Sequence, residues 1–255
     1  MRSLLFMIRV GVTSVTAVAC QQTGDSPSAH ARPAATAATA SATPSGSAGA
    51  PPALRALMAE HFSRAASVKN AVIAGDLQAS KEDAEWMAKH ELSRSLPDRW
   101  RPHVQAMQAA AQRVVDATDT ATAARATADM GQACGSCHRA LGGPKFQVGS
   151  PPAEGSGAAI QMMRHEWAVD RMWEGLIGPS DAAWVKGSEA LGGAILIKKA
   201  LEKSVPPEVE SLARKIRDLG EKSRSAAPEE RAALYGEFLG TCAECHSKLG
   251  VGKKK

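Results

Sequence analysis

Aromatic side chains are scarce in this 255-residue sequence, which contains five Trp, four Phe and one Tyr. So few rings leave little to fill the interior of a large β-sandwich or barrel. The alternation of apolar and polar residues that marks a half-buried strand is also missing over any useful length. Apolar residues still make up 44% of the chain, enough for a folded core. The composition therefore excludes a disordered chain, argues against an all-β fold, and favours an all-α fold.

An excess of charge of one sign is also lacking. The 31 Lys and Arg residues face 26 Asp and Glu residues, which gives a formal charge of +5. Removal of Arg2 and Arg9 with the segment that we expect to be cleaved lowers this charge to +3. The one dense basic block is the three-lysine tail at 253–255, which is weak evidence for a nucleic-acid partner. We therefore expect no binding of nucleic acid.

The N-terminus has the form of an export signal. A short basic start is followed by an apolar run to Ala19, too short for a transmembrane helix and typical of a secretory signal peptide over 1–19. The Ala-Val-Ala-Cys sequence at 17–20 resembles a bacterial lipobox, in which the Cys is lipidated, although Leu is usual at the position of Ala17. An ordinary signal-peptidase site after Ala19 is the alternative. We favour lipidation because Cys20 has no other evident partner.

Two segments poor in large apolar residues divide the chain. Residues 20–52 are mainly Ala, Ser, Thr, Gly and Pro, which cannot bury enough surface to offset the entropy of ordering them. This composition predicts a flexible tether after a lipidated Cys20, holding the folded part at a membrane surface on the periplasmic side of a bacterial cell envelope. A second break, rich in Gly and Pro, spans 143–157. The folded blocks are thus predicted at 53–142 and 158–255.

Cysteine is also rare, with five residues in all. The four besides Cys20 form two copies of one motif, Cys134-Gly-Ser-Cys137-His138 and Cys242-Ala-Glu-Cys245-His246. C-x-x-C-H is the attachment signature of c-type haem: two thiols add to the two vinyl groups of one porphyrin, and the adjacent His binds the iron. Zinc ribbons place their Cys pairs about 15–20 residues apart, and thioredoxin-like motifs need a βαβ pattern that we do not find. The motifs therefore predict two covalently bound haem c groups, with His138 and His246 as proximal iron ligands.

The two blocks form an internal repeat. Six stripe positions recur 104 residues apart, with steps of 4, 3, 4, 3 and 4 that lie on one face of a helix. They are Leu54, Met58, His61, Ala65, Val68 and Val72 in the first block, and Ala158, Met162, His165, Val169, Met172 and Leu176 in the second. Gly75 and Gly178 follow as helix ends.

Three further helices are expected in each block. The second helices are predicted at 77–95 and 180–203, and Pro97 and Pro206 mark the next turns. The last helix of the second block should begin after Pro228 and end near Gly250, with both attachment cysteines on its inner face. Short turns between four helices suggest an up-down-up-down arrangement. We therefore predict two tandem four-helix bundles, each with C-x-x-C-H near the end of its last helix.

With four helices and C-x-x-C-H near the end of the last one, each block resembles the class II c-type cytochromes, the cytochrome c-prime family. Class I cytochromes c carry the motif near the start of the domain instead. The resemblance covers both blocks, about 190 residues, and excludes the tether and the signal peptide. It implies a haem-binding helical bundle, electron transfer and, in some members, gas binding. Where many members have Met or an apolar residue facing the distal side, this chain has His61 and His165.

These two histidines are candidate sixth ligands of the irons. A lone His on an apolar helix face is more often a core residue than a ligand, but here it recurs in both repeats, whereas His90 and His103 have no counterparts. Met58 and Met162, three residues earlier, are alternative ligands, and an open distal side is the third possibility. A Met ligand would raise the potential relative to His, and an open position would permit ligand binding.

The function that these patterns favour is electron transfer by an exported diheme c-type cytochrome, with redox proteins or quinol-linked electron donors as partners. A gas-binding or peroxide-reducing haem protein with an open distal side is the alternative. A peroxidase would also need polar acid–base groups over the haem, and the sequence shows no further convergent acid. We therefore expect a carrier rather than an enzyme. A structural lipoprotein whose haems have lost their partners is a third possibility.

Overall fold

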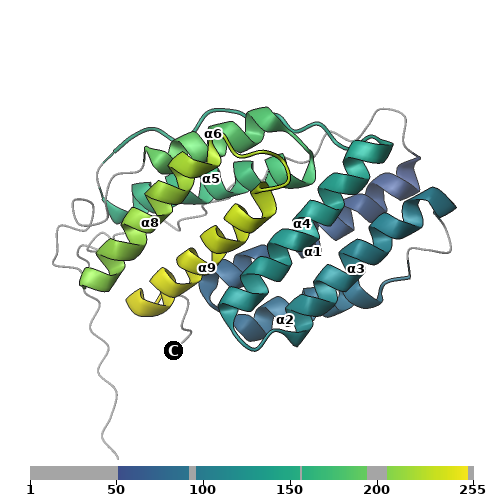
Figure 1. Cartoon of the computed structure of the whole chain (residues 1–255), viewed down its shortest axis with the longest axis horizontal. Helices are drawn as coiled ribbons and strands as arrows, with labels where there is room; N and C mark the ends of the chain where they lie inside the picture. The colour runs from purple at the N-terminus through teal and green to yellow at the C-terminus, as the bar shows by residue number, and fades with distance from the viewer. Residues whose placement is uncertain (1–50, 92–95, 156, 194–205, 252–255) are drawn as a thin grey trace, which may run out of the picture. The chain divides into compact units, whose positions relative to one another are not determined.

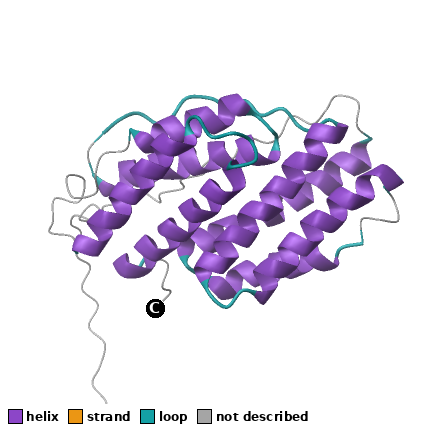
Figure 2. Cartoon of the chain, in the orientation of Figure 1, coloured by secondary structure: helices purple, strands orange, loops and turns teal. Residues whose placement is uncertain are grey.

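The computed structural model describes residues 51–91, 96–155, 157–193 and 206–251, all within one compact unit formed by 39–255. The predicted signal peptide, Cys20, nearly all of the tether and the lysine tail lie outside the described residues. Within the described ranges the regular structure is helical and includes no β-strand (Figure 2). The prediction of an all-α fold is confirmed. None of the helices in these ranges is both long and apolar enough to cross a membrane.

The first block contains four α-helices and one 3₁₀ turn. They are α1 (Pro52–Ala74), α2 (Leu77–Lys89), η1 (Asp98–Trp100), α3 (Arg101–Asp116) and α4 (Thr120–Leu141). Helix α1 ends where the sequence predicted, because Gly75 adopts a left-handed conformation (φ 75°) that a glycine tolerates without strain. Helix α2 was predicted to reach residue 95 but ends at Lys89, because His90 has an extended backbone. Asp76 and Asp119 cap α2 and α4 by accepting main-chain N–H bonds.

The second block contains α5 (Ala158–Ile177), α6 (Asp181–Gly192), α8 (Pro207–Ser223) and α9 (Arg231–Leu249). Proline occupies the first turn of α8, where its missing N–H costs nothing. Gly250 ends α9 in the left-handed conformation (φ 68°), as expected. The predicted second helix of this block extended to residue 203, and its part beyond Gly193 lies outside the described residues.

The helices of each block pack mainly on their sequence neighbours. Helix α1 contacts α2 and α4, and α3 also contacts both α2 and α4. In the second block α6 contacts α5 and α8, and α8 contacts α9. The most extensive pairing of helices, however, joins the two blocks: α4 lies beside α9, the two helices that carry the C-x-x-C-H motifs (Figure 1). Contacts of α1 with α9 and of α4 with α5 complete the junction.

Most buried hydrophobic side chains, from both blocks, form one continuous cluster, and a small second cluster consists of Val209, Leu212, Ala213 and Cys245. The fully buried aromatic residues lie in the second block, where the indole of Trp173 stacks on Tyr235 at 5.7 Å between ring centroids. Two of these aromatic residues use their polar group in a hydrogen bond: Tyr235 donates to the carbonyl of Val169, and Trp184 donates to that of Ser223. The first block packs mainly Met, Val and Ala instead.

Candidate functional site

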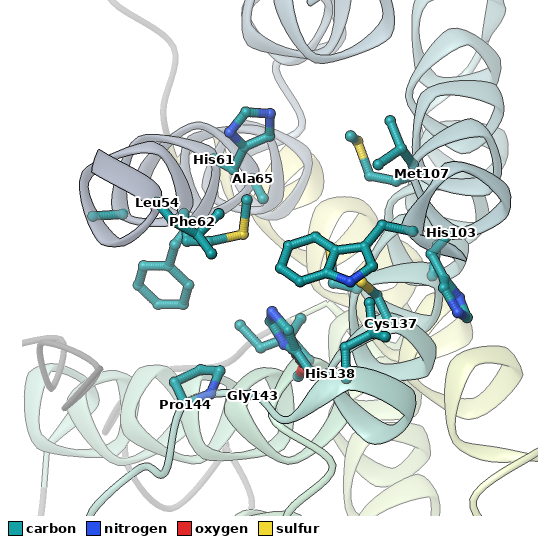
Figure 3. Close-up of a pocket in the computed structure, with 18 of the residues that line it drawn as sticks. Leu54, His61, Phe62, Ala65, His103, Met107, Cys137, His138, Gly143 and Pro144 are labelled. Carbon is teal, nitrogen blue, oxygen red and sulfur yellow. Dashed lines mark hydrogen bonds between the residues drawn. The ribbon is translucent and has the colours of Figure 1, made fainter. Parts of the chain in front are cut away.

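The C-x-x-C-H motif of the first block borders a cavity of about 510 Å³. Helix α4 contributes Cys134, Cys137 and His138 to its wall, and α1 contributes His61 from another side (Figure 3). The rest of the wall comes from other residues of α1 and α4, from α3 and the segment before it, from α5 and from the chain segment after α4, and it is largely apolar. The volume lies within the roughly 300–1,000 Å³ of typical ligand and cofactor sites. The structure thus brings a predicted proximal His, its two cysteines and a predicted distal His to one cavity.

His138 is fixed by a hydrogen bond to the main chain of the other block. Its Nδ1 lies 2.6 Å from the carbonyl oxygen of Ile177, in the last turn of α5. Because a carbonyl oxygen only accepts, Nδ1 carries the proton and Nε2 keeps its lone pair. Burial lowers the pKa of His138, while the bond to Ile177 opposes this change. The neutral imidazole therefore presents a free Nε2, the form that can bind a metal.

His246 has the equivalent bond in the second block. Its Nδ1 lies 2.8 Å from the carbonyl oxygen of Ile73, in the last turn of α1. Because the carbonyl oxygen only accepts, Nδ1 carries a proton here too, and Nε2 is not used in this bond. The two bonds cross between the blocks, since each motif histidine contacts the first helix of the other repeat.

The four cysteines of the motifs are free thiols in the structure. Burial raises the pKa of Cys134 and of Cys242 to about 12, with a smaller contribution from the neighbouring motif cysteine in each case. Burial also raises the pKa of Cys137 and Cys245. All four are therefore neutral thiols at physiological pH. In the described ranges, no three His, Cys, Asp or Glu side chains are grouped so that they could hold a metal ion.

His61 is buried on α1, beside the first cavity. Its Nδ1 donates to the carbonyl of Leu57 at 2.9 Å, so Nε2 is unprotonated. Nε2 is buried and has no hydrogen-bond partner among the described residues. Burial lowers the pKa of His61, and the nearby His90 adds to this effect. The ring also lies edge-on to Trp86 at 5.0 Å and to His90 at 5.3 Å between centroids.

His165 occupies the equivalent position on α5. Its Nε2 is likewise buried without a partner in the described part of the chain. Burial lowers the pKa of His165 to about 4, and the electrostatic interaction with His246 is the next largest cause. The imidazole is therefore neutral at physiological pH and close enough to His246 to interact with it electrostatically. Met58 lines the first cavity, and Met162 is half-buried.

Two tryptophans provide the other nitrogens without a hydrogen-bond partner at the cavity of the first block. The indole Nε1 atoms of Trp100 and Trp173 are buried without a hydrogen-bond partner among the described residues, and both rings line the cavity. An unpaired buried N–H costs about 1–3 kcal/mol. A bound group with acceptor atoms would satisfy these two N–H groups, whereas the unprotonated Nε2 of His61 would need a donor or a metal ion. No pattern in the sequence singles out Trp100 or Trp173 for this role.

The segment between the blocks also contributes to the site. Phe146 lines the cavity, and its ring lies 6.1 Å from that of Phe62 between centroids. Arg171 of α5 donates to the main-chain carbonyls of Gln147 and Val148 and so holds this segment against the second block. The Gly and Pro content of 143–157 predicted a break between blocks but not this contribution to the cavity.

Comparisons of the chain with protein-family models, with curated proteins and with solved structures give no significant match. The interpretation of the site therefore depends on its own residues and geometry.

Proposed function

We propose that the protein is an exported diheme c-type cytochrome that carries electrons between redox partners, built as two tandem four-helix bundles similar to class II cytochromes. One observation above all supports this proposal: Cys134, Cys137 and His138 share a cavity with His61, whose Nε2 is buried without a partner. In this proposal each C-x-x-C-H motif binds one haem c, which supplies an iron that alternates between two oxidation states.

The residues at the first cavity fit such a group. The wall is largely apolar, which suits a porphyrin plane, and its unsatisfied polar atoms are nitrogens of His61, Trp100 and Trp173. A haem offers both an iron for an imidazole nitrogen and carboxylates for N–H donors. The four motif cysteines are free thiols and are therefore available for thioether formation.

The roles of the chain's own side chains follow from their protonation. Cys134, Cys137, Cys242 and Cys245 would form the thioether bonds. His138 and His246 would bind the two irons through Nε2, because their Nδ1 atoms are occupied. His61 and His165 would bind the opposite faces, because each has a neutral ring with a buried, unpartnered Nε2. Ligation would remove the free-energy cost of leaving those atoms unpaired.

An anchor at Cys20 would complete the carrier. A lipidated Cys20 followed by the tether would hold the haem domains near the periplasmic face of a membrane, within reach of redox proteins or quinol-linked donors. Labelled fatty acid should enter the wild type and not the Cys20→Ala variant. A freely soluble, unlabelled wild type would favour ordinary signal cleavage instead and would leave the haem proposal unaffected.

A second candidate function is supported by the surroundings of His61. Its ring lies against Trp86 and His90, and these two rings stack on each other at 4.1 Å between centroids. If these contacts hold His61 away from the iron, the first haem has an open distal side and can bind a diatomic gas. Carbon monoxide binding to the reduced wild type distinguishes the two candidates.

The test of the main proposal is the number of attached haems. Expression in a host with c-type maturation machinery should give a protein mass increased by two haems, which remain bound after denaturation and acid extraction. The double variant Cys134→Ala, Cys137→Ala should keep one haem, and so should Cys242→Ala, Cys245→Ala. A wild type that gains no haem under these conditions would overturn the proposal.

A further inference from the structure

The two motif histidines are held crosswise between the repeats. His138 of the first repeat donates to Ile177 of the second, and His246 of the second donates to Ile73 of the first. The two acceptor residues are 104 residues apart, the same spacing as the positions of the helical stripe. The pattern is therefore a property of the repeat, present twice, rather than a single accidental contact.

Each acceptor is a carbonyl that its own helix leaves unpaired. The last four carbonyls of an α-helix have no partner within the helix. At the end of α1 the main-chain N–H groups of Gly75 and Asp76 bond to Val72 and Ala71, which leaves the carbonyl of Ile73 for His246. At the end of α5 the N–H groups of Gly178 and Ser180 bond to Glu174 and Gly175, which leaves Ile177 for His138.

Close packing of the helices makes these bonds possible. Gly131, Gly135 and His138 follow one another at steps of four and three, so they share one face of α4. A Cβ at Gly135 would lie 2.2 Å from the carbonyl oxygen of Leu176, and one at Gly131 would lie 2.5 Å from the ring of Trp173. Glycine therefore lets α4 approach the end of α5 closely enough for His138 to reach Ile177.

We propose that each repeat supplies the group that orients and polarises the proximal histidine of the other repeat's haem. This inference depends on the proposed function. The carbonyl fixes the tautomer, so that Nε2 faces the iron. It also lies at the negative end of a helix dipole, which draws the Nδ1 proton and makes the imidazole a stronger donor to the metal. A stronger donor stabilises the oxidised iron and lowers its reduction potential. The carbonyls of Ile73 and Ile177 are thus positioning groups, and neither repeat holds a complete site alone.

Gly75→Ala tests the crosswise relation in the full-length holoprotein. Gly75 belongs to the first repeat and ends α1 two residues after Ile73. Its φ of 75° is strained for alanine, although the added Cβ would make only an ordinary contact, 3.5 Å from the carbonyl of Ala243. The end of α1 should therefore shift and weaken the bond to His246. We expect the reduction potential of the haem on Cys242 and Cys245 to rise, while that of the haem on Cys134 and Cys137 stays unchanged.

Gly149→Ala is the matched control, because Gly149 also has a positive φ (64°) but has no atom, and so neither carbonyl, within 4 Å of its Cβ position. It should leave both potentials unchanged. The two haems are assigned by removing one motif at a time through its cysteine pair. A Gly75→Ala protein with both haems attached and both potentials unchanged would overturn the inference. So would a shift confined to the first haem.

A measurement on the haem-free protein tests the same relation without the cofactor. In ¹⁵N-labelled wild type, the imidazole nitrogens of His138 and His246 should report a proton on Nδ1, and this proton should exchange slowly with solvent. Protons on Nε2 or rapid exchange at both rings would contradict the inference. If the wild type attaches no haem but shows these tautomers, the proposed function fails while the crosswise bonds stand.

Discussion

Lys69 of α1 and Asp170 of α5 form an ion pair inside the protein, although 101 residues separate them in the chain. The side chain of Lys69 is 4% exposed and that of Asp170 is 16% exposed. The pair joins the first helices of the two repeats. Positions 69 and 170 are not equivalent in the repeat, so this link exists once. Each charge depends on the other, because a buried charge without a partner is costly.

Removal of one partner should therefore destabilise the protein strongly. Lys69→Met leaves the partly buried Asp170 carboxylate without this partner, and we expect a loss of up to about 3–5 kcal/mol in the free energy of unfolding, the range for a fully buried pair. The double variant Lys69→Met, Asp170→Leu should recover much of this loss, since no charge is left unpaired. Denaturant unfolding followed by circular dichroism measures both effects.

The exposed pair of Arg113 and Asp129 provides the control. Their side chains are about half exposed and lie 2.8 Å apart. Arg113→Met should cost no more than about 1 kcal/mol, because water screens the pair. Equal losses for the Lys69 and Arg113 variants would show that the Lys69–Asp170 pair contributes no more than a surface pair.

Glu174 should make stability depend on pH. It is buried beside Arg171, with 2.5 Å between the Arg171 Nη2 and Oε1. Burial raises the pKa of Glu174 to about 7, although Arg171 acts in the opposite direction. The folded protein therefore holds a proton that the unfolded chain releases near its ordinary pKa of 4.5. Below about pH 4.5 the proton on Glu174 should contribute its full stabilisation. As the pH rises from about 4.5 to about 7, the free energy of unfolding should fall by roughly 3 kcal/mol.

Glu174→Gln should remove this part of the pH dependence, since glutamine does not titrate. Unfolding free energies measured at intervals between pH 4.5 and 8 test the effect. Glu229→Gln, at an exposed position, is the control and should leave the slope unchanged. If Glu174→Gln and the wild type show the same slope over this range, Glu174 is already ionised in the folded protein.

Glycines at the crossing of α5 and α6 should be needed for stability. A Cβ at Gly187 would lie 2.6 Å from the carbonyl oxygen of Ala168 and 2.7 Å from Cγ of Met172. Gly187→Ala should therefore force the helices apart and lower the free energy of unfolding by about 1–3 kcal/mol. At Gly240 the nearest atom would be 3.7 Å away, so Gly240→Ala should instead stabilise α9 by roughly 0.5–1 kcal/mol. The midpoint temperature of thermal unfolding should therefore fall for Gly187→Ala and rise for Gly240→Ala.

The helical stripe was enough to predict much of the fold. Its spacing located the first helix of each repeat, and Gly75 and Gly250 marked two helix ends correctly. The end of α2 was predicted too late, because nothing in the composition of 90–95 shows that His90 is extended. Lys69 lies beside Val68 at the edge of the stripe, and its burial depends on a partner that only the tertiary packing brings near.

Only those parts of the candidate site that consist of side chains could be predicted from the sequence. Spacing identified Cys134, Cys137 and His138, and the structure places them on one cavity. The acceptors of the motif histidines are main-chain carbonyls, which every residue has, so no residue type marks them. The 104-residue spacing of Ile73 and Ile177 was visible in the sequence. Only the packing of α4 on α5 and of α9 on α1, however, shows that these two residues are the acceptors of the motif histidines.

Iron ligation on the distal side gives the last prediction. His165 has a buried Nε2 with no partner in the described residues and a ring that stays neutral, so binding to the second iron would satisfy it. We expect His165→Ala to convert that haem from low spin to high spin and to let carbon monoxide bind it. His61→Ala should do the same to the first haem. His103→Ala, which removes a cavity-lining histidine without a counterpart in the repeat, should change neither spectrum. Because the truncation leaves a space of the shape of the lost ring, added imidazole should restore the low-spin spectrum of His165→Ala. A wild type with two high-spin irons that both bind carbon monoxide would contradict ligation by either histidine and favour the gas-binding candidate.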